Sequence, residues 1–253
     1  MAKRNLLIAG NWKMHKTPDE SAEEALKIAS MLGDFDLSNK EVMIAPSFTG
    51  LYPTGEALKD TKITLGAQNM YYEEKGAYTG EISASMLKGC GCRYVIIGHS
   101  ERRQVFNESD ELINKKISAA ISNSLIPVFC VGETKSERNE NKTLNVLDKQ
   151  IKNGLKGIFV SGSNELVIAY EPVWAIGTGD TATPDQVEEV HKNIRGLIEK
   201  IYNKNVAENI KILYGGSVKS GNAAELLSLD NVDGALVGGA SLDAKDFTEI
   251  IKA

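Results

Sequence analysis

The sequence is poor in cysteine, proline and aromatic residues: its 253 residues include 3 cysteines, 6 prolines and 6% Phe, Trp and Tyr. The cysteines, at positions 90, 92 and 130, are too few and odd in number for a disulfide framework, which favours a reducing, cytoplasmic location. No apolar run approaches the roughly 20 residues that a membrane helix requires. Four apolar residues precede Gly10, which is too few for a signal peptide. We therefore expect neither a membrane protein nor an exported one.

Positive charge is also scarce in the sequence. Lys and Arg number 29 and Asp and Glu number 34, which gives a formal net charge of −5. A nucleic-acid-binding surface requires an excess of basic side chains, so we expect no nucleic-acid partner. A small anionic ligand remains compatible with this balance, because a few local groups are enough to hold one.

Metal-binding motifs are missing as well. The sequence contains neither Cys-x-x-Cys nor His-Glu-x-x-His. His99 and Glu101 have the His-x-Glu spacing of zinc deaminases, but the Pro-Cys-x-x-Cys segment of those enzymes is absent. We expect no metal site and no cofactor.

Eight short, continuous apolar runs alternate with helical patterns along the chain. Continuous runs are typical of strands that are buried on both faces of a parallel sheet. The runs are residues 6–9, 42–45, 63–65, 94–97, 126–131, 166–170, 210–214 and 235–237. Two apolar helix faces are Val187, Val190, Ile194, Ile198 and Ile201, and Leu144, Leu147, Ile151, Leu155 and Ile158. Helix starts are indicated by Thr17, Ser109 and Thr183, each followed by acidic or capping residues.

This pattern predicts an α/β fold in which eight parallel strands close into a single (β/α)8 barrel with outer helices. No composition break divides the chain, so we expect one domain over residues 1–253. An open doubly wound sheet is the alternative. Six of the eight runs end in glycine, at positions 10, 66, 98, 132, 215–216 and 238–239. In a barrel the active site lies at the carboxyl ends of the strands, so functional residues are expected directly after each run.

Four polar residues stand at such strand ends. Asn11 and Lys13 follow the first run and alternate onto one side, His99 follows the fourth, and Glu171 follows the sixth. Lys13 could instead be an ordinary solvated lysine, and His99 a packed or solvent-facing histidine without a role in catalysis. Their positions at strand ends favour catalytic roles. We expect Glu101 and the neighbouring arginines to form a supporting ion-pair network.

The segment after Glu171 is typical of a lid that closes over a site. It consists of Pro172, Val173, Trp174, Ala175, Ile176, Gly177, Thr178 and Gly179. An exposed connector is the alternative, although Trp and Ile are costly to leave in water. The segment also matches the dinucleotide pattern G-x-G-x-x-A, but residues 171–174 separate its glycines from the strand and the acidic partner would be Glu199, inside a helix. We therefore expect no nicotinamide cofactor.

Paired glycines follow the seventh and eighth runs. Gly215 and Gly216 precede Ser217, and Gly238 and Gly239 follow the last strand. Glycine lets backbone N–H groups approach a ligand closely, and the loops after strands seven and eight are a frequent phosphate site in barrels. Tight turns are the alternative, but two glycine pairs at the two expected strands favour phosphate.

Taken together, these segments resemble the triosephosphate isomerase family. The similar blocks are residues 10–14 (GNWKM), 68–69 (QN), 96–103 (IIGHSERR), 169–179 (AYEPVWAIGTG), 213–217 (LYGGS) and 236–240 (LVGGA). They occur in family order over nearly the whole chain. The resemblance implies interconversion of dihydroxyacetone phosphate and D-glyceraldehyde 3-phosphate through an enediolate, in glycolysis and gluconeogenesis. Another sugar-phosphate isomerase or epimerase, or a catalytically silent barrel that acts as a binding partner, are the alternatives.

The resemblance also assigns roles to individual residues. Glu171 would be the base, neutral His99 the electrophile, Lys13 the group that stabilises negative charge, and Asn11 a hydrogen-bond donor to the substrate. The backbone N–H groups of Gly177, Ser217, Gly238 and Gly239 would hold the phosphate.

A homodimer is implied too. Residues 69–80 form the expected arm, and the interface would include Met14, Gln68, Asn69, Tyr78 and Thr79. Two residues depart from the commoner family pattern: His15 stands where Asn is frequent, and Asp180 where Lys is usual at the far hinge of the lid.

Overall fold

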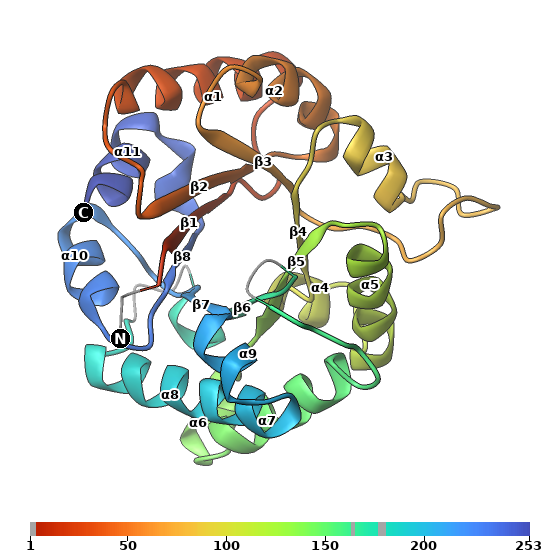
Figure 1. Ribbon diagram of the computed structural model, residues 1–253, viewed down its shortest axis with the longest axis vertical. Coiled ribbons are helices and arrows are strands. Elements are labelled where there is room, and N and C mark those ends of the chain that lie inside the picture. Colours follow the sequence, from red (N-terminus) through yellow and green to blue (C-terminus); the bar gives the residue numbers. More distant parts are fainter. Residues whose placement is uncertain (1–3, 163–164, 177–180) are drawn as a thin grey trace.

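The computed structural model describes residues 4–162, 165–176 and 181–253, and these build a closed barrel of parallel strands surrounded by helices (Figure 1). Each strand pairs with the next in the sequence, and β8 returns to β1. The strands are β1 (Leu6–Asn11), β2 (Lys40–Ala45), β3 (Ile63–Ala67), β4 (Tyr94–Ile97), β5 (Ile126–Val131), β6 (Val167–Tyr170), β7 (Lys211–Tyr214) and β8 (Gly234–Val237). The predicted (β/α)8 architecture is confirmed.

Helices cover the outside of this barrel, and their starts follow the sequence signals. The α-helices are α1 (Pro18–Leu32), α2 (Leu51–Leu58), α3 (Ala84–Gly89), α4 (Ser100–Gln104), α5 (Asp110–Ser122), α6 (Lys135–Asn139), α7 (Thr143–Gly154), α8 (Pro184–Ile201), α9 (Lys204–Asn209), α10 (Ser220–Ser228) and α11 (Ala244–Lys252). Three short 3-10 helices are η1 (Phe48–Gly50), η2 (Val173–Ala175) and η3 (Gly239–Leu242). Thr17 and Thr183 form capping boxes, and the Ser109 side chain accepts a hydrogen bond from the backbone of Leu112.

Two of the predicted strand-ending glycines lie inside strands. Strand β1 continues past Gly10 and β3 past Gly66, so neither residue closes its strand. A Cβ at position 10 would lie 3.1 Å from the Phe247 ring and from Ser241, and one at position 66 would lie 2.6 Å from the Met43 sulfur. These glycines are therefore required for close packing against neighbouring elements.

The predicted helix face on α7 is partly wrong. Leu147 and Ile151 are fully buried, but Leu144 is 42% exposed and Ile158 lies beyond the last residue of the helix. The chain leaves the helical path at Leu155, so the periodic pattern extends further than the helix itself. On α8, in contrast, the predicted face is buried as far as Ile198, and Ile201 is half-buried.

Apolar side chains fill the interior of the barrel. The inward-facing cluster contains Leu7, Ala9, Met43, Ala45, Tyr94, Ile96, Ile126, Val128, Cys130, Val167, Ala169, Leu213 and Leu236. Their packing closes the barrel axis, as is usual for this fold. The barrel interior therefore leaves no space for a ligand, and within the barrel the rim at the strand ends is the place to look for a site.

Candidate active site

A cavity of about 200 Å³ lies at the carboxyl ends of the strands and collects residues from both halves of the chain. Its lining includes Asn11, Lys13, His99, Glu171, Ile176, Ser217, Gly238 and Gly239. The structure thus brings together all four predicted catalytic residues and three of the four predicted phosphate-binding positions. The fourth, Gly177, lies outside the described residues.

Glu171 is buried at the end of β6 and contacts two hydrogen-bond donors. Its Oε1 lies 2.9 Å from His99 Nε2, and its Oε2 accepts a 2.9 Å hydrogen bond from the backbone N–H of Ser100. Burial alone would raise the pKa of Glu171, but these two contacts outweigh it and lower the pKa below its ordinary value. The free site therefore holds this side chain as a carboxylate.

His99 is the N-cap residue of α4, and its two ring nitrogens have different partners. Nδ1 accepts a hydrogen bond of 3.2 Å from the backbone N–H of Glu101, so this nitrogen carries no proton. Nε2 then bears the proton of the neutral ring and donates a hydrogen bond to Glu171. Burial lowers the pKa of His99, but the adjacent Glu171 carboxylate raises it above the ordinary value. The predicted neutral state of His99 is thus opposed while Glu171 stays in contact.

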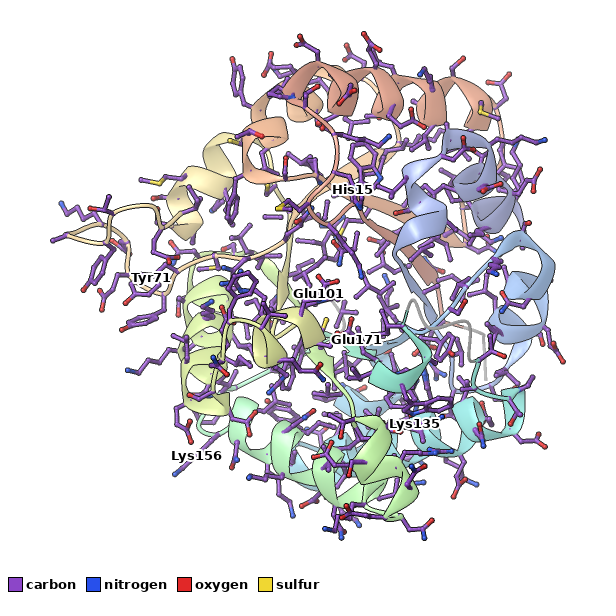
Figure 2. All side chains as sticks on the ribbon, turned by 180° about the vertical axis from the view of Figure 1, so that it is seen from behind. His15, Tyr71, Glu101, Lys135, Lys156 and Glu171 are labelled. Atoms are coloured by element: carbon purple, nitrogen blue, oxygen red, sulfur yellow. The ribbon has the colours of Figure 1, made fainter. Side chains whose placement is uncertain are left out.

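Lys13 is fixed at the cavity by backbone and side-chain contacts. Its backbone is in the left-handed region, with φ 52°, and its N–H donates to Asn11 Oδ1 at 3.1 Å. Its carbonyl accepts a 2.8 Å hydrogen bond from Gln68 Nε2. The ammonium group lies 2.7 Å from Glu101 Oε1. Glu101 and Glu171 both lie near the centre of the barrel mouth (Figure 2).

The predicted ion-pair network is confirmed only in part, because Glu101 and the neighbouring arginines all form ion pairs but not with one another. Arg102 pairs with Glu108 at 2.5 Å and Arg103 with Asp110 at 2.7 Å. Glu101 instead extends toward Lys13, because the turn of α4 directs the arginine side chains to other elements. Its role is therefore electrostatic support of the cavity lysine.

The glycines at the rim fall into two groups. A Cβ at position 215 would lie 2.9 Å from Glu171 Cγ, and one at position 216 only 2.2 Å from the Tyr214 hydroxyl. Close packing is therefore enough to explain why glycine occupies positions 215 and 216. At Gly238 the nearest atom would be Lys13 Cε at 3.4 Å, and at Gly239 nothing lies within 4 Å. The pair after β8 faces open space in the cavity, which favours a ligand there.

Comparison with known proteins decides the family. Residues 6–253 match the family described as triosephosphate isomerase. The chain belongs to the triosephosphate isomerase family. Similar curated triosephosphate isomerases come from Endomicrobium trichonymphae (51% identity over 98% of both chains) and Chloroherpeton thalassium (50% over 99% of both). A solved triosephosphate isomerase structure from Bartonella henselae is 43% identical, with a TM-score of 0.88 over 98% of both chains.

Membership in the triosephosphate isomerase family defines the activity. The chain is an isomerase that interconverts dihydroxyacetone phosphate and D-glyceraldehyde 3-phosphate, a reaction of glycolysis. Among the described residues no group of three or more His, Cys, Asp and Glu side chains is arranged to hold a metal ion. No described helix is long and apolar enough to cross a membrane.

The predicted triosephosphate isomerase lid begins in a well-anchored stem. Val173 and Trp174 belong to η2, where the backbone N–H of Val173 donates to the carbonyl of Glu133 at 3.1 Å. Trp174 Nε1 donates to Glu133 Oε1 at 3.0 Å. Lys135 and Arg138 lie 5.1 and 5.4 Å from the indole centre. The predicted positions 177–179 of the lid, and Asp180, lie outside the described residues.

The residues predicted for a triosephosphate isomerase dimer interface have mixed environments. Met14 is 94% exposed, and Tyr78 and Thr79 are exposed on the segment that projects from the barrel between β3 and α3 (Figure 1). Gln68 and Asn69 also have partners within the chain: Gln68 donates to the Ala45 carbonyl, and Asn69 Oδ1 accepts from Lys116.

A larger groove of about 620 Å³ lies outside the barrel, between α7 and α8. Its charged lining residues are Asp148, Glu189, Lys192 and Lys200. None of the predicted catalytic residues reaches it. The predicted catalytic residues gather instead at the smaller cavity at the strand ends.

One charged cavity residue was not singled out from the sequence. Lys219 lines the cavity beside the glycine pair after β7. Its position two residues after the predicted phosphate-binding Ser217 was the sequence signal that could have indicated a place at the cavity.

Proposed function

We propose that Glu171 is the catalytic base and His99 the electrophile of the isomerisation. A proton next to a carbonyl is weakly acidic, so its removal requires a positioned base and a donor at the carbonyl oxygen. Glu171 takes the proton from one carbon and returns it to the adjacent one, while His99 Nε2–H donates to the oxygen. The observation that carries this assignment is the 2.9 Å contact between these two buried groups at the cavity.

Substrate entry exchanges the partners of Glu171. In the free site His99 and the Ser100 N–H keep its pKa low. When the substrate displaces the carboxylate from these donors, burial remains, and burial raises the pKa of a carboxyl group. Glu171 thereby becomes a stronger base at the moment it faces the substrate. His99 loses its anionic neighbour in the same step, which favours the neutral ring; the family is a standard example of that behaviour.

The remaining roles follow from charge and backbone geometry. Lys13 stabilises negative charge on the enediolate, and Asn11 donates a hydrogen bond to substrate oxygens. The backbone N–H groups of Ser217, Gly238 and Gly239 hold the phosphate, together with Gly177 of the lid. Closure of the lid, residues 172–179, excludes water and strengthens these interactions; loop closure in this family is a standard example too. The reaction requires no cofactor or metal.

The test shortens the base by one methylene. Purified protein should convert D-glyceraldehyde 3-phosphate without added metal or nucleotide. In Glu171→Asp we expect kcat to fall by about 100-fold or more, with a much smaller change in the Kd of a phosphate-bearing substrate analogue. Glu199→Asp, on exposed α8 surface, is the matched control and should match the parent protein. Equal losses of kcat and analogue affinity in Glu171→Asp would contradict the assignment.

We also propose a cytoplasmic homodimer built from single-domain subunits. Cys90, Cys92 and Cys130 are all free thiols, which suits a reducing compartment. Pairing of β8 with β1 joins the two ends of the chain in one barrel, which supports a single domain. The exposed Met14 and Tyr78 supply apolar surface for a second subunit, with Thr79, Gln68 and Asn69 beside them.

A further inference from the structure

The charged side chains around the cavity are unequally partnered. Among the described residues that line it, the charged groups are Lys13, Glu171 and Lys219. The Lys13 ammonium lies 2.7 Å from Glu101, so much of its charge is compensated. Lys219 is exposed and forms no ion pair with any carboxylate in the described parts of the chain. It is therefore the cavity cation whose field remains uncompensated.

Local hydrogen bonds fix the backbone of Lys219 at the rim. Its N–H donates to Asn222 Oδ1 at 2.8 Å, and Asn222 Nδ2 donates to the Ser217 carbonyl at 3.1 Å. Val218, between them, is buried. The turn from β7 into α10 thus holds Lys219 two residues from Ser217, while the long side chain stays in solvent.

The substrate needs a positive field at this place. A phosphate monoester carries nearly two negative charges at neutral pH, whereas the chain has a formal net charge of −5 and the cavity contains the Glu171 carboxylate. We propose that Lys219 is a substrate-binding residue that attracts the phosphate of the incoming triose phosphate and orients it toward the loops after β7 and β8. This inference rests on the proposed phosphate position at Ser217, Gly238 and Gly239.

Lys219 should affect the rate at which the substrate associates with the protein. Triosephosphate isomerases are among the enzymes whose kcat/KM approaches the diffusional limit, so the capture of substrate controls their efficiency. A cation at the rim accelerates the encounter with a dianion, and added salt screens that attraction. Lys219 has no contact with the reacting carbons in this scheme, so turnover of bound substrate is independent of it.

The experiment compares Lys219→Met with Lys156→Met, which removes the same charge from exposed surface far from the site (Figure 2). Steady-state kinetics with D-glyceraldehyde 3-phosphate are measured from low to high ionic strength. At low ionic strength we expect kcat/KM of Lys219→Met to fall about fivefold, with kcat within about twofold of the parent. The difference should shrink toward unity in high salt, and Lys219→Arg should restore most of kcat/KM. Lys156→Met should behave like the parent protein.

Three outcomes would overturn the proposal. An unchanged kcat/KM in Lys219→Met, a loss independent of salt, or a loss confined to kcat would each exclude a role in attracting the phosphate. Thermal unfolding of each variant separates a packing defect from a charge effect. Failure of the catalytic assignment is distinguishable, because it would appear in Glu171→Asp and leave the salt dependence of Lys219→Met unchanged.

Discussion

The backbone around Glu171 is positioned by glycines on neighbouring strands. A Cβ at Gly132 would lie 1.7 Å from the Glu171 carbonyl oxygen, and one at Gly215 would lie 2.9 Å from its Cγ. Neither contact is sterically tolerated, so the positions that directly follow β5 and β7 must lack a side chain. The position of Glu171 is therefore determined by these two glycines as well as by its own hydrogen bonds.

The buried side chain of His191 should make the protein less stable in acid. It is fully buried in α8, its Nδ1 lies 3.2 Å from the Asn231 carbonyl oxygen, and burial lowers its pKa from 6.5 to about 3. Between these values the unfolded chain binds a proton that the folded chain does not. The free energy of unfolding should therefore fall by ~1.4 kcal/mol per pH unit through this group as the pH drops below 6.5.

Urea unfolding at pH 7, 6 and 5 measures this dependence. His191→Gln should be less stable than the parent at pH 7, because the buried ring packs against Tyr170 and Tyr214. Its stability should fall less steeply with acid. The same substitution at exposed His15 controls for the loss of an imidazole. Parallel slopes for His191→Gln and the parent would contradict the prediction.

At the scale of the element, Glu133 should determine the stability of the lid stem. This buried carboxylate accepts hydrogen bonds from Tyr170 and Trp174, at 3.1 and 3.0 Å. Glu133→Leu leaves both donors without this partner, so the free energy of unfolding should fall by about 3 kcal/mol, and η2 should lose its anchor. Glu133→Gln retains an acceptor oxygen and should lose less.

Denaturant unfolding and isomerase kinetics test this ranking together. Because η2 begins two residues after Glu171, kcat should fall in Glu133→Leu in addition to stability. A Thr134→Ala substitution, next along the chain at the capping box of α6, is the control for local helix stability. Equal stability of the Leu and Gln variants would show that the hydrogen bonds to Glu133 contribute nothing.

The strands and helix starts were predictable because their causes are local. A strand buried on both faces has a continuous apolar run, and β4 and β5 match their predicted bounds. Strand-end position alone indicated Lys13, His99 and Glu171. The packing role of Gly10 was not predictable, because it depends on Phe247, more than two hundred residues away in the chain. The ion pair of Glu101 with Lys13 was not predictable for the same reason, because the two residues come from different strand ends and are far apart in the sequence.

At the scale of the whole molecule, the proposed dimer should support the active site. Met14 follows Lys13 directly and is almost fully exposed in the single chain. A second subunit that covers this surface would hold the segment that carries the lysine. We expect Met14→Asp to shift the protein to monomer and to lower kcat at least tenfold, since burying a charge in an apolar interface is unfavourable.

Sedimentation velocity combined with activity over a dilution series measures this prediction. Met31→Asp, on a half-exposed methionine of α1, is the matched control and should leave both properties unchanged. A fully active monomeric Met14→Asp would separate association from catalysis. A dimeric variant with parental activity would place the interface elsewhere.

The filled barrel interior determines how a substrate can enter the proposed site and how its product can leave. Apolar side chains block the axis, so at the proposed site a triose phosphate would reach Glu171 from the rim and its isomer would leave by the same opening. The two sugars are constitutional isomers with the same phosphate, and both must vacate the same groups before the next turnover. Each isomer would thus compete with the other for the same site, so accumulation of one should slow net conversion of the other.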